Sequence, residues 1–329
     1  MLAVCCLLSG CGLFSSGSAE DAGKPAVALP ELDMKRVESD EKWGIKYSED
    51  KRTLLKYDPK LRVKKYVVPA GVTAIGEGAF LECPNLAEVV LPAGMTTVGK
   101  GAFAKCRELT KVSIPPGVTT IGTGAFFRCP KLKAALLPPT VTTIPPKAFA
   151  GCVGLESVVI PSGATAIGDR AFFGCSRLTK VVIPASVETI GHGAFRGCST
   201  LTEITISKGV RSIGNSAFAE CKSLGTVAIP EGVETVGEGV FSECWALERV
   251  TFGAGTTSIG KGAFFRCEKL TGVTLPEGLV SIGDIAFVEC GSLKDIAIPK
   301  SVKTIGKGAF KNTPCDEKVM EAHPDLYRL

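Results

Sequence analysis

A period of 23 residues constrains this chain more than any other feature of its sequence. Phenylalanine recurs at this step at positions 80, 103, 126, 149, 172, 195, 218, 241, 264, 287 and 310. Leucine recurs at 86, 109, 132, 155, 178, 201, 224, 247, 270 and 293, and valine or isoleucine recurs at 75, 98, 121 and onward to 305. Such self-similarity predicts a solenoid, in which each coil buries its apolar face against its neighbours.

The repeat unit reads L-x-x-V-x-I-P-x-G-V-T-x-I-G-x-G-A-F-x-x-C-x-x. Residues 178–184 (LTKVVIP) predict a short strand with Val181 and Ile183 pointing inward, ended by the proline. Residues 187–191 predict a turn into a second short extended piece. Residues 193–198 predict one tight turn, helical or 3₁₀, that buries the phenylalanine and the cysteine.

The segment at residues 43–69 is expected to cap the N-terminal end of the array. It carries two strand-like runs around charged turns, with Tyr66 in register with Val89 one coil later. Its basic cluster has two interpretations, a patch that binds an anionic partner or a charged end strand that blocks edge-to-edge association. The members of this basic cluster are Lys60, Arg62, Lys64 and Lys65.

Residues 313–329 predict a helical cap at the other end. Thr313 is expected to be the N-cap and Pro314 the first helical residue, followed by acidic residues in the first turn. This helix would cover the last coil.

The first eleven residues, MLAVCCLLSGC, are apolar and uncharged. A short apolar segment that ends in small residues is typical of an export signal. Leu8-Ser9-Gly10-Cys11 resembles a bacterial lipobox, in which the cysteine is acylated, although no Lys or Arg precedes the apolar segment. The alternative is an apolar N-terminus with no such function. Residues 12–42, rich in Ser, Gly, Ala, Pro and charge, predict a flexible tether.

The repeat resembles the BspA-like family of leucine-rich repeats over residues 46–312, through the motif I-G-x-x-A-F-x-x-C-x-x-L. The resemblance implies an α/β repeat solenoid: a right-handed, leucine-rich-repeat-type stack of about eleven coils at residues 70–312, with short parallel strands on one face. It also implies display outside the cell, since some members are linked to adhesion. The departures from the repeat are Ala135, Pro145, Ser207, Val240, Gly253 and Thr313.

Ten cysteines follow the phenylalanines at an offset of three residues, from Cys83 to Cys290. In a stack they form a straight column about 4.8 Å apart with parallel side chains. Disulfides need converging Cβ atoms near 3.8 Å, and a tetrahedral metal needs four ligands around one point. No histidine or asparagine column accompanies them as a base. The column therefore predicts free, buried thiols that fill a repeated slot, with Cys315 outside it.

Other features argue against catalysis and against nucleic-acid binding. The net charge of +5 comes from 38 basic and 33 acidic residues mixed along the chain. The only histidines are His192 and His323, too few for a histidine-based site. The recurring G-x-G lacks the βαβ context of a phosphate-binding loop and indicates turn glycines. We expect no enzyme, no cofactor, no metal, no nucleic acid and no small-molecule substrate.

The outward columns of the first strand are the best candidates for a partner-binding face. The fifth strand position, which we call the uncharged strip, carries no charge in any coil: Val90, Ser113, Leu136, Val159, Val182, Thr205, Ala228, Thr251, Thr274 and Ala297. The third position alternates in sign. The predicted face comprises Val90, Lys111, Leu136, Val159, Lys180, Val182, Glu203 and Arg249. The alternative is that β-branched residues suit any strand.

Together these features predict a surface-exposed, lipid-anchored scaffold, an adhesin that binds host or microbial surface proteins. The membrane would be reached only through the lipid on Cys11, and the cell surface or outer membrane is favoured over the periplasm. The alternative is a periplasmic or envelope-internal assembly module that uses the same face without an adhesion role.

Overall fold

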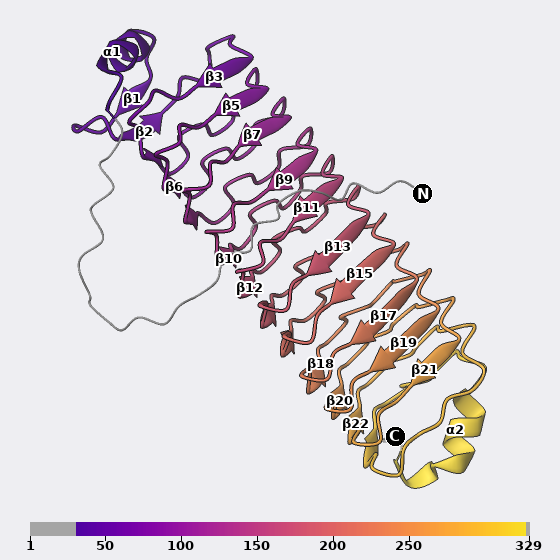
Figure 1. The fold of residues 1–329 in the computed structure, drawn as a ribbon. Coiled ribbons are helices and arrows are strands. Elements are labelled where there is room, and N and C mark those ends of the chain that lie inside the picture. The colour runs from indigo at the N-terminus through magenta and orange to yellow at the C-terminus, as the bar shows by residue number, and fades with distance from the viewer. Residues whose placement is uncertain (1–30, 327–329) are drawn as a thin grey trace, which may run out of the picture.

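The computed structural model describes residues 31–326. They form an elongated stack of coils with helix α1 (Met34–Lys42) at one end and helix α2 (Asp316–Ala322), followed by the 3₁₀ turn η1 (Pro324–Leu326), at the other (Figure 1). The 23-residue step of the sequence is the step of the coils, because the parallel pairings from β3 and β4 onward join residues 23 apart, as Lys180 to Glu203. The first pairing, β2 with β4, has a step of 21 residues, as Thr53 to Ala74. The predicted solenoid of about eleven coils is confirmed.

One face of the stack carries the first parallel ladder (Figure 1). Its strands form four consecutive short sheets, β3-β5-β7, β9-β11, β13-β15 and β17-β19-β21. Their bounds are β3 Lys65–Val67, β5 Glu88–Val90, β7 Lys111–Ser113, β9 Ala134–Leu136, β11 Ser157–Val159, β13 Lys180–Ile183, β15 Glu203–Ile206, β17 Thr226–Ile229, β19 Arg249–Phe252 and β21 Gly272–Thr274.

A second parallel ladder forms where the repeat predicted a second extended piece. Its strands are β2 Thr53–Lys56, β4 Ala74–Ile75, β6 Thr97–Val98, β8 Thr120–Ile121, β10 Thr143–Ile144, β12 Ala166–Ile167, β14 Thr189–Ile190, β16 Ser212–Ile213, β18 Thr235–Val236, β20 Ser258–Ile259, β22 Ser281–Ile282 and β23 Thr304–Ile305. Strand β1 (Lys46–Tyr47) pairs antiparallel with β2 and closes this ladder at the N-terminal end.

The second ladder breaks between β8 and β10, and Pro145 explains the break. In neighbouring coils a glycine at this position donates its N–H to the coil before, as Gly122 does to Val98 at 2.7 Å and Gly168 to Ile144 at 2.8 Å. Proline has no N–H to donate, so this rung is missing. One departure from the repeat therefore has a visible structural consequence.

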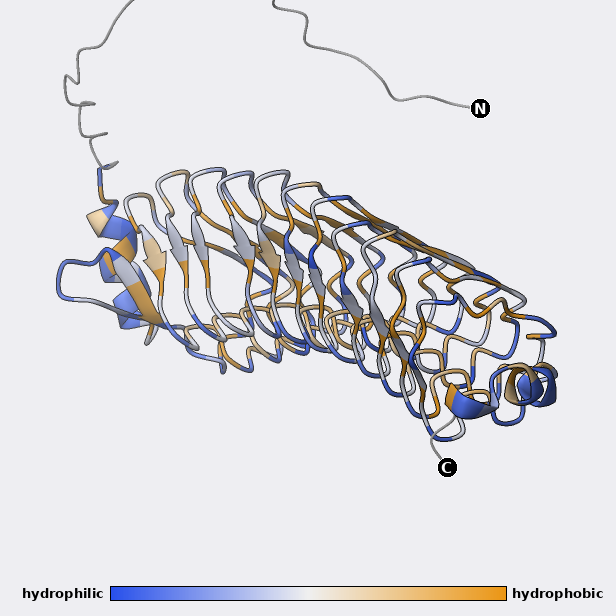
Figure 2. Cartoon of the chain, turned by 90° about the horizontal axis from the view of Figure 1, so that it is seen from below, coloured by the Kyte–Doolittle hydropathy of each residue, from blue (hydrophilic) through white to orange (hydrophobic). Residues whose placement is uncertain are grey.

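The core between the ladders is a column of stacked phenylalanine rings. From Phe80 to Phe310 neighbouring rings lie 4.9 to 5.6 Å apart and within 13° of parallel. Tyr57, one period before Phe80, begins the column at 5.1 Å. Figure 2 shows hydrophobic segments along the coils and hydrophilic ones in the turns and end helices. The column joins all coils into one continuous core, since each ring packs on both neighbours.

The turns that carry the phenylalanines are not helical, so the prediction of a helical or 3₁₀ turn over residues 193–198 is wrong. Alternate N–H groups bond within the coil, as Arg196 to Gly193 at 3.1 Å, and the others bond to the next coil, as Phe195 to Ala217 at 2.8 Å. Gly193 and Gly197 adopt φ of 56° and 75°. Bonding to the next coil removes every second donor that a helix would need.

At the N-terminal end, the prediction of a flexible tether over 12–42 is wrong for residues 34–42, which form α1. The Asp33 side chain caps this helix by accepting the N–H of Arg36 at 3.0 Å. The cap segment at residues 43–69 contains three short strands, β1, β2 and β3, where two strand-like runs were expected. The predicted register of Tyr66 with Val89 is confirmed. Residues 12–30 lie outside the described part.

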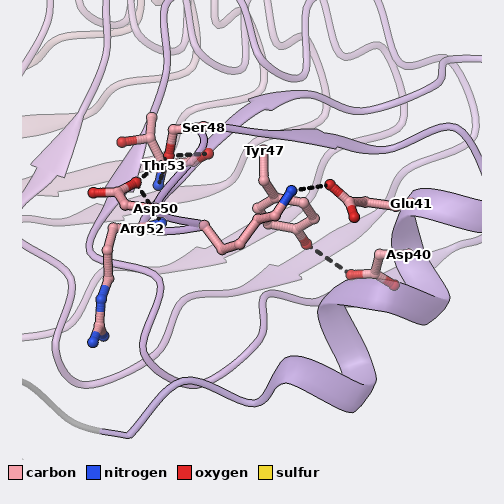
Figure 3. A network of polar contacts seen from close by, with 8 residues as sticks. Asp40, Glu41, Tyr47, Ser48, Asp50, Arg52 and Thr53 are labelled. Carbon is pink, nitrogen blue, oxygen red and sulfur yellow. Dashed lines mark hydrogen bonds and ion pairs between the residues drawn. The ribbon is translucent and has the colours of Figure 1, made fainter.

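Helix α1 is held by the buried carboxylate of Asp40, which is only 4% exposed. The hydroxyl of Tyr47 donates to it at 2.8 Å, as Figure 3 shows, and the hydroxyl of Tyr66 donates to it as well. The guanidinium of Arg36 lies 3.1 Å from the same group. Beside it, Lys51 pairs with Glu41 at 2.6 Å. Burying a carboxylate is costly unless it is hydrogen-bonded or paired, so these contacts hold α1 against the first coil.

At the C-terminal end the predicted helix is present, but Thr313 is not its N-cap and Pro314 is not its first residue. The helix begins at Asp316, with Cys315 in the cap position and no side-chain cap. The hydroxyl of Thr313 instead donates to the carbonyl of Phe310 at 2.6 Å. This local bond closes the last coil, and the helix starts only after it.

Candidate functional site

The uncharged strip runs along the outward side of the first ladder. Leu136, Val159 and Val182 are 71%, 57% and 53% exposed, whereas Val90 is half-buried. The backbone register places Leu136 directly beside Val159. The strip also extends one coil further than the sequence reading placed it, since Val67, 48% exposed, pairs with Val90. Val67 lies 23 residues before Val90 and so follows the same step, but residues 43–69 had been assigned to the N-terminal cap.

Charged side chains border this strip at the third strand position. Lys180 and Glu203 lie next to each other in the ladder and form an ion pair at 2.8 Å, and Lys65 pairs with Glu88 at 3.3 Å. Lys111 and Arg249 are exposed. Exposed pairs of this kind add little stability. What they provide is a charged border along a face whose centre has no charge.

The basic cluster of the N-terminal cap is exposed in all four members. Lys65 belongs to the ion pair with Glu88, and Arg62 lines a hollow of ≈ 380 Å³ with Trp43 and Tyr57. The hydroxyl of Tyr57 has no hydrogen-bond partner in the described residues, and burial raises its pKa to about 12. The cluster is spread over the end of the stack, which leaves both interpretations of it open.

The predicted column of free, buried thiols is confirmed from Cys83 to Cys290, and Cys315 is buried as well. From the second coil onward each Sγ donates to the carbonyl of the phenylalanine 26 residues earlier, as Cys198 to Phe172 at 3.3 Å. Burial raises the pKa of the Cys198 and Cys244 thiols to about 12. A raised pKa and full burial make these thiols poor nucleophiles, so the column serves packing.

No group of three or more metal-ligating side chains occurs within residues 31–326. In the same part of the chain, no helix is long and apolar enough to cross a membrane. Cys11, the residue expected to carry the lipid, lies outside the described residues.

The parallel ladders, the shared aromatic core and the outward columns define a repeat scaffold, a class of protein that binds through its long faces. The chain matches the family model of the BspA-type leucine-rich repeat region in six copies, over residues 59–179 and 188–317. It therefore belongs to the BspA-type leucine-rich repeat family. Members of such families are typically non-enzymatic scaffolds, and the family indicates a protein-binding or surface role.

Two solved bacterial structures are similar to the chain. A leucine-rich repeat protein from Bacteroides ovatus is 24% identical, with 86% of this chain and 91% of that one covered and a TM-score of 0.55. A leucine rich cell surface protein from Faecalibacterium prausnitzii is 27% identical, with 89% and 93% covered and a TM-score of 0.48. The first supports the solenoid fold. A search of curated protein sequences gives no match.

Proposed function

We propose that the protein is a lipid-anchored, surface-exposed scaffold that binds a protein partner through the uncharged strip. The observation that carries the proposal is the run of Leu136, Val159 and Val182, each more than half exposed on consecutive coils. Large apolar side chains gathered on a regular, rigid face are a common feature of protein-binding surfaces. The flanking charges, such as Lys180 and Glu203, would set the orientation of the partner.

The membrane attachment in this proposal comes from the lipobox-like sequence that ends at Cys11. Two or more acyl chains on one cysteine suffice for stable anchoring, whereas a single chain binds only marginally. Intact mass of the membrane-extracted protein tests this part. A mass that fits a chain beginning at Cys11 with attached acyl groups supports it, and an unacylated N-terminus rejects it.

The strip is tested with Val159→Asp/Val182→Asp. Labelled protein is applied to host or bacterial cells, and bound fluorescence is measured before and after the cells are treated with protease. We expect binding that depends on protease-sensitive receptors and that falls at least ten-fold in the variant, since burying an unpaired carboxylate is costly. The matched control, Thr251→Asp/Thr274→Asp, adds the same charge in the same column outside the apolar run.

Thermal unfolding should change little in either variant, because all four side chains point outward. Equal binding by the parent protein and Val159→Asp/Val182→Asp would remove this face from the proposal. Protease digestion of intact producing cells separates surface display from the alternative, an assembly module inside the envelope: digestion supports display, and protection supports the alternative.

A further inference from the structure

A groove of ≈ 550 Å³ lies on the turns that carry the phenylalanines, away from the uncharged strip. Its floor is Ala150, which is buried between two outward-facing phenylalanines on the coils before and after it. We call it the basic groove and define it by six lining residues: Phe127, Lys147, Arg170, Phe173, His192 and Arg196.

At the groove, two positions of the repeat hold residues unlike those of the other coils: a position that is usually glycine holds Lys or Arg, and a position that is usually charged holds glycine. The first column adopts positive φ and holds glycine in most coils, but Lys147 and Arg170 occupy it with φ of 57° and 53°. A residue with a side chain is strained in this conformation, and neither Lys nor Arg is among the residues that tolerate it best. Two consecutive coils thus place a cation where the fold favours glycine.

The second column, two residues after each buried phenylalanine, shows the opposite exchange. It holds charged residues in the coils before and after the groove, among them Glu82, Lys105, Glu220, Glu243 and Arg266. In three of the four coils that line the groove it holds Gly151, Gly174 and Gly197, and in the fourth it holds Arg128 beside Phe127. A Cβ built at Gly174 meets nothing within 4 Å. Long side chains are missing here, which leaves the backbone open beside the groove.

The cations of the groove are only partly neutralised. Within residues 31–326 no carboxylate lies within ion-pair distance of Lys147 or Arg170, while Arg196 pairs with Glu220 at 2.7 Å. The carboxylate of Asp169, next to Arg170 in sequence, accepts the backbone N–H of His192 at 2.8 Å. An anion entering the groove would therefore meet two free cations.

Donors that do not carry a full charge complete the lining. Nδ1 of His192 accepts the N–H of Asn215 at 3.1 Å, which places the ring proton on Nε2 as a free donor. Ser216 and Asn215 also line the space; Oδ1 of Asn215 accepts the N–H of Glu238 at 3.0 Å, so its NH₂ group is the donor that remains. Phe127 and Phe173 stand two coils apart, roughly 10 Å at about 4.8 Å per coil. Phe173 is 40% exposed, so an apolar ring face is available on one side of the slot.

We propose that the basic groove binds an acidic saccharide, a short chain of pyranose rings that carry carboxylate or sulfate groups. The C–H face of a pyranose ring packs on the exposed ring of Phe173, while Phe127, whose ring carries the Arg128 guanidinium at 5.1 Å, closes the end of the slot. Lys147 and Arg170 pair with the acidic groups of the saccharide. Ser216 and Asn215 can bond ring hydroxyls. Such convergence of apolar faces with a few placed polar groups is typical of a ligand site. The saccharide is a ligand and undergoes no reaction.

An acidic peptide fits this groove less well than a saccharide. A peptide gains much of its affinity by pairing its backbone with free N–H and C=O groups. Here those groups are already used between coils: Lys147 N–H bonds to Asp169 O at 2.9 Å, and Arg170 N–H bonds to His192 O at 2.8 Å. The groove therefore offers its ligand side chains alone.

Calorimetric titration of the full chain with three probes tests the proposal: a sulfated heparin tetrasaccharide, tri-galacturonate, and neutral maltotriose of similar ring chemistry. We expect at least one acidic probe to bind at 150 mM salt and maltotriose not to bind. Lys147→Gly/Arg170→Gly should weaken the binding at least ten-fold while its melting temperature stays equal or rises, because glycine relieves the strained φ.

Two controls separate the charge from the backbone. Ile285→Gly relieves the same left-handed position, φ 51°, outside the groove, and Lys303→Ala removes one exposed cation elsewhere; both should bind as the parent does. Phe173→Ala should weaken the saccharide while leaving binding of inorganic sulfate unchanged. Equal affinity of Lys147→Gly/Arg170→Gly and the parent, no binding of either acidic probe, or tighter binding of an Asp/Glu octapeptide would overturn the proposal.

Discussion

The buried thiols of Cys198 and Cys244 should make the protein less stable in mild alkali. A thiol that is neutral and buried in the fold but free to ionise in the unfolded chain favours unfolding as pH rises. Cys198 and Cys244 have pKa values raised from the usual 9.0 to about 12 by burial. Their stabilisation is complete below pH 9 and is lost progressively as pH rises toward about 12.

The magnitude follows from these pKa values. At pH 10 the unfolded thiol is about nine-tenths ionised and the folded one is neutral, which favours unfolding by about 1.4 kcal/mol per thiol. Cys198 and Cys244 together therefore favour unfolding by about 3 kcal/mol at pH 10, a large share of the whole stability of a typical domain, about 5–15 kcal/mol. Burial also raises the pKa of Cys175, Cys221 and Cys267, and the neighbouring thiol of Cys152, followed by burial, raises that of Cys129.

The assay is urea unfolding followed by circular dichroism at pH 7, 8, 9 and 10, with a phosphine reductant present. Cys198→Ala/Cys244→Ala should be less stable than the parent at pH 7, since each change leaves a small cavity. Between pH 7 and pH 10 the parent should lose about 3 kcal/mol more than this variant. The burial of Tyr57 adds little below pH 10, because its pKa is raised from 10.0.

Val210→Ala/Val233→Ala is the matched control, because it also removes buried volume in the same part of the stack but no titrating group; both valines are fully buried. Its stability curve should run parallel to that of the parent across the pH range. The reasoning is refuted if Cys198→Ala/Cys244→Ala also runs parallel to the parent, since the thiols would then ionise equally in both states.

Two further predictions concern the stack itself. Phe218→Ala removes a ring packed at 5.4 and 5.5 Å on its two neighbours, so it should lower the free energy of unfolding in urea by about 3–5 kcal/mol. Phe310→Ala, with one neighbouring phenylalanine, should lower it by less. Equal losses in the two variants would contradict the role of stacking. Gly209→Ala should destabilise the protein, because its Cβ would lie 1.8 Å from the carbonyl oxygen of Ala185. Gly225→Ala, whose Cβ would have nothing within 4 Å, should stabilise the protein by about 0.4–1 kcal/mol. Melting temperatures that move in the same direction in both variants would contradict the close approach of the coils.

The repeating parts of the fold were predictable because the same apolar pattern recurs in each of about eleven coils. Val181 and Ile183 point inward in one coil, and the same columns point inward in all the others. The cap helix α1 has no such support. Only Val37 and Asp40 are buried in it, so it lacks the apolar periodicity that marks a helix. The one usable signal was Asp33, a favourable N-cap residue.

The basic groove was missed for a different reason. Its six side chains come from four successive coils and become neighbours only when the coils stack, so His192 looked isolated in the chain. Reading each column for its departures would have found Lys147 and Arg170 in a glycine column. Which of them remain unpaired depends on side-chain geometry, which the column alone does not contain.

The most irregular coils of the array coincide on both of its faces. The fold makes the same demands of each coil, so residues that differ over consecutive coils are the ones that folding does not dictate. Residues 136 to 197 contain the apolar run of the uncharged strip, the missing rung at Pro145, the two cations Lys147 and Arg170 at positive φ, and the three glycines Gly151, Gly174 and Gly197. Lys147 and Arg170 at positive φ cost the fold stability, and the exposed Val159 and Val182 add little to the packing of the core. A binding role in this middle segment accounts for both, which is why its two faces are the places to test for ligands.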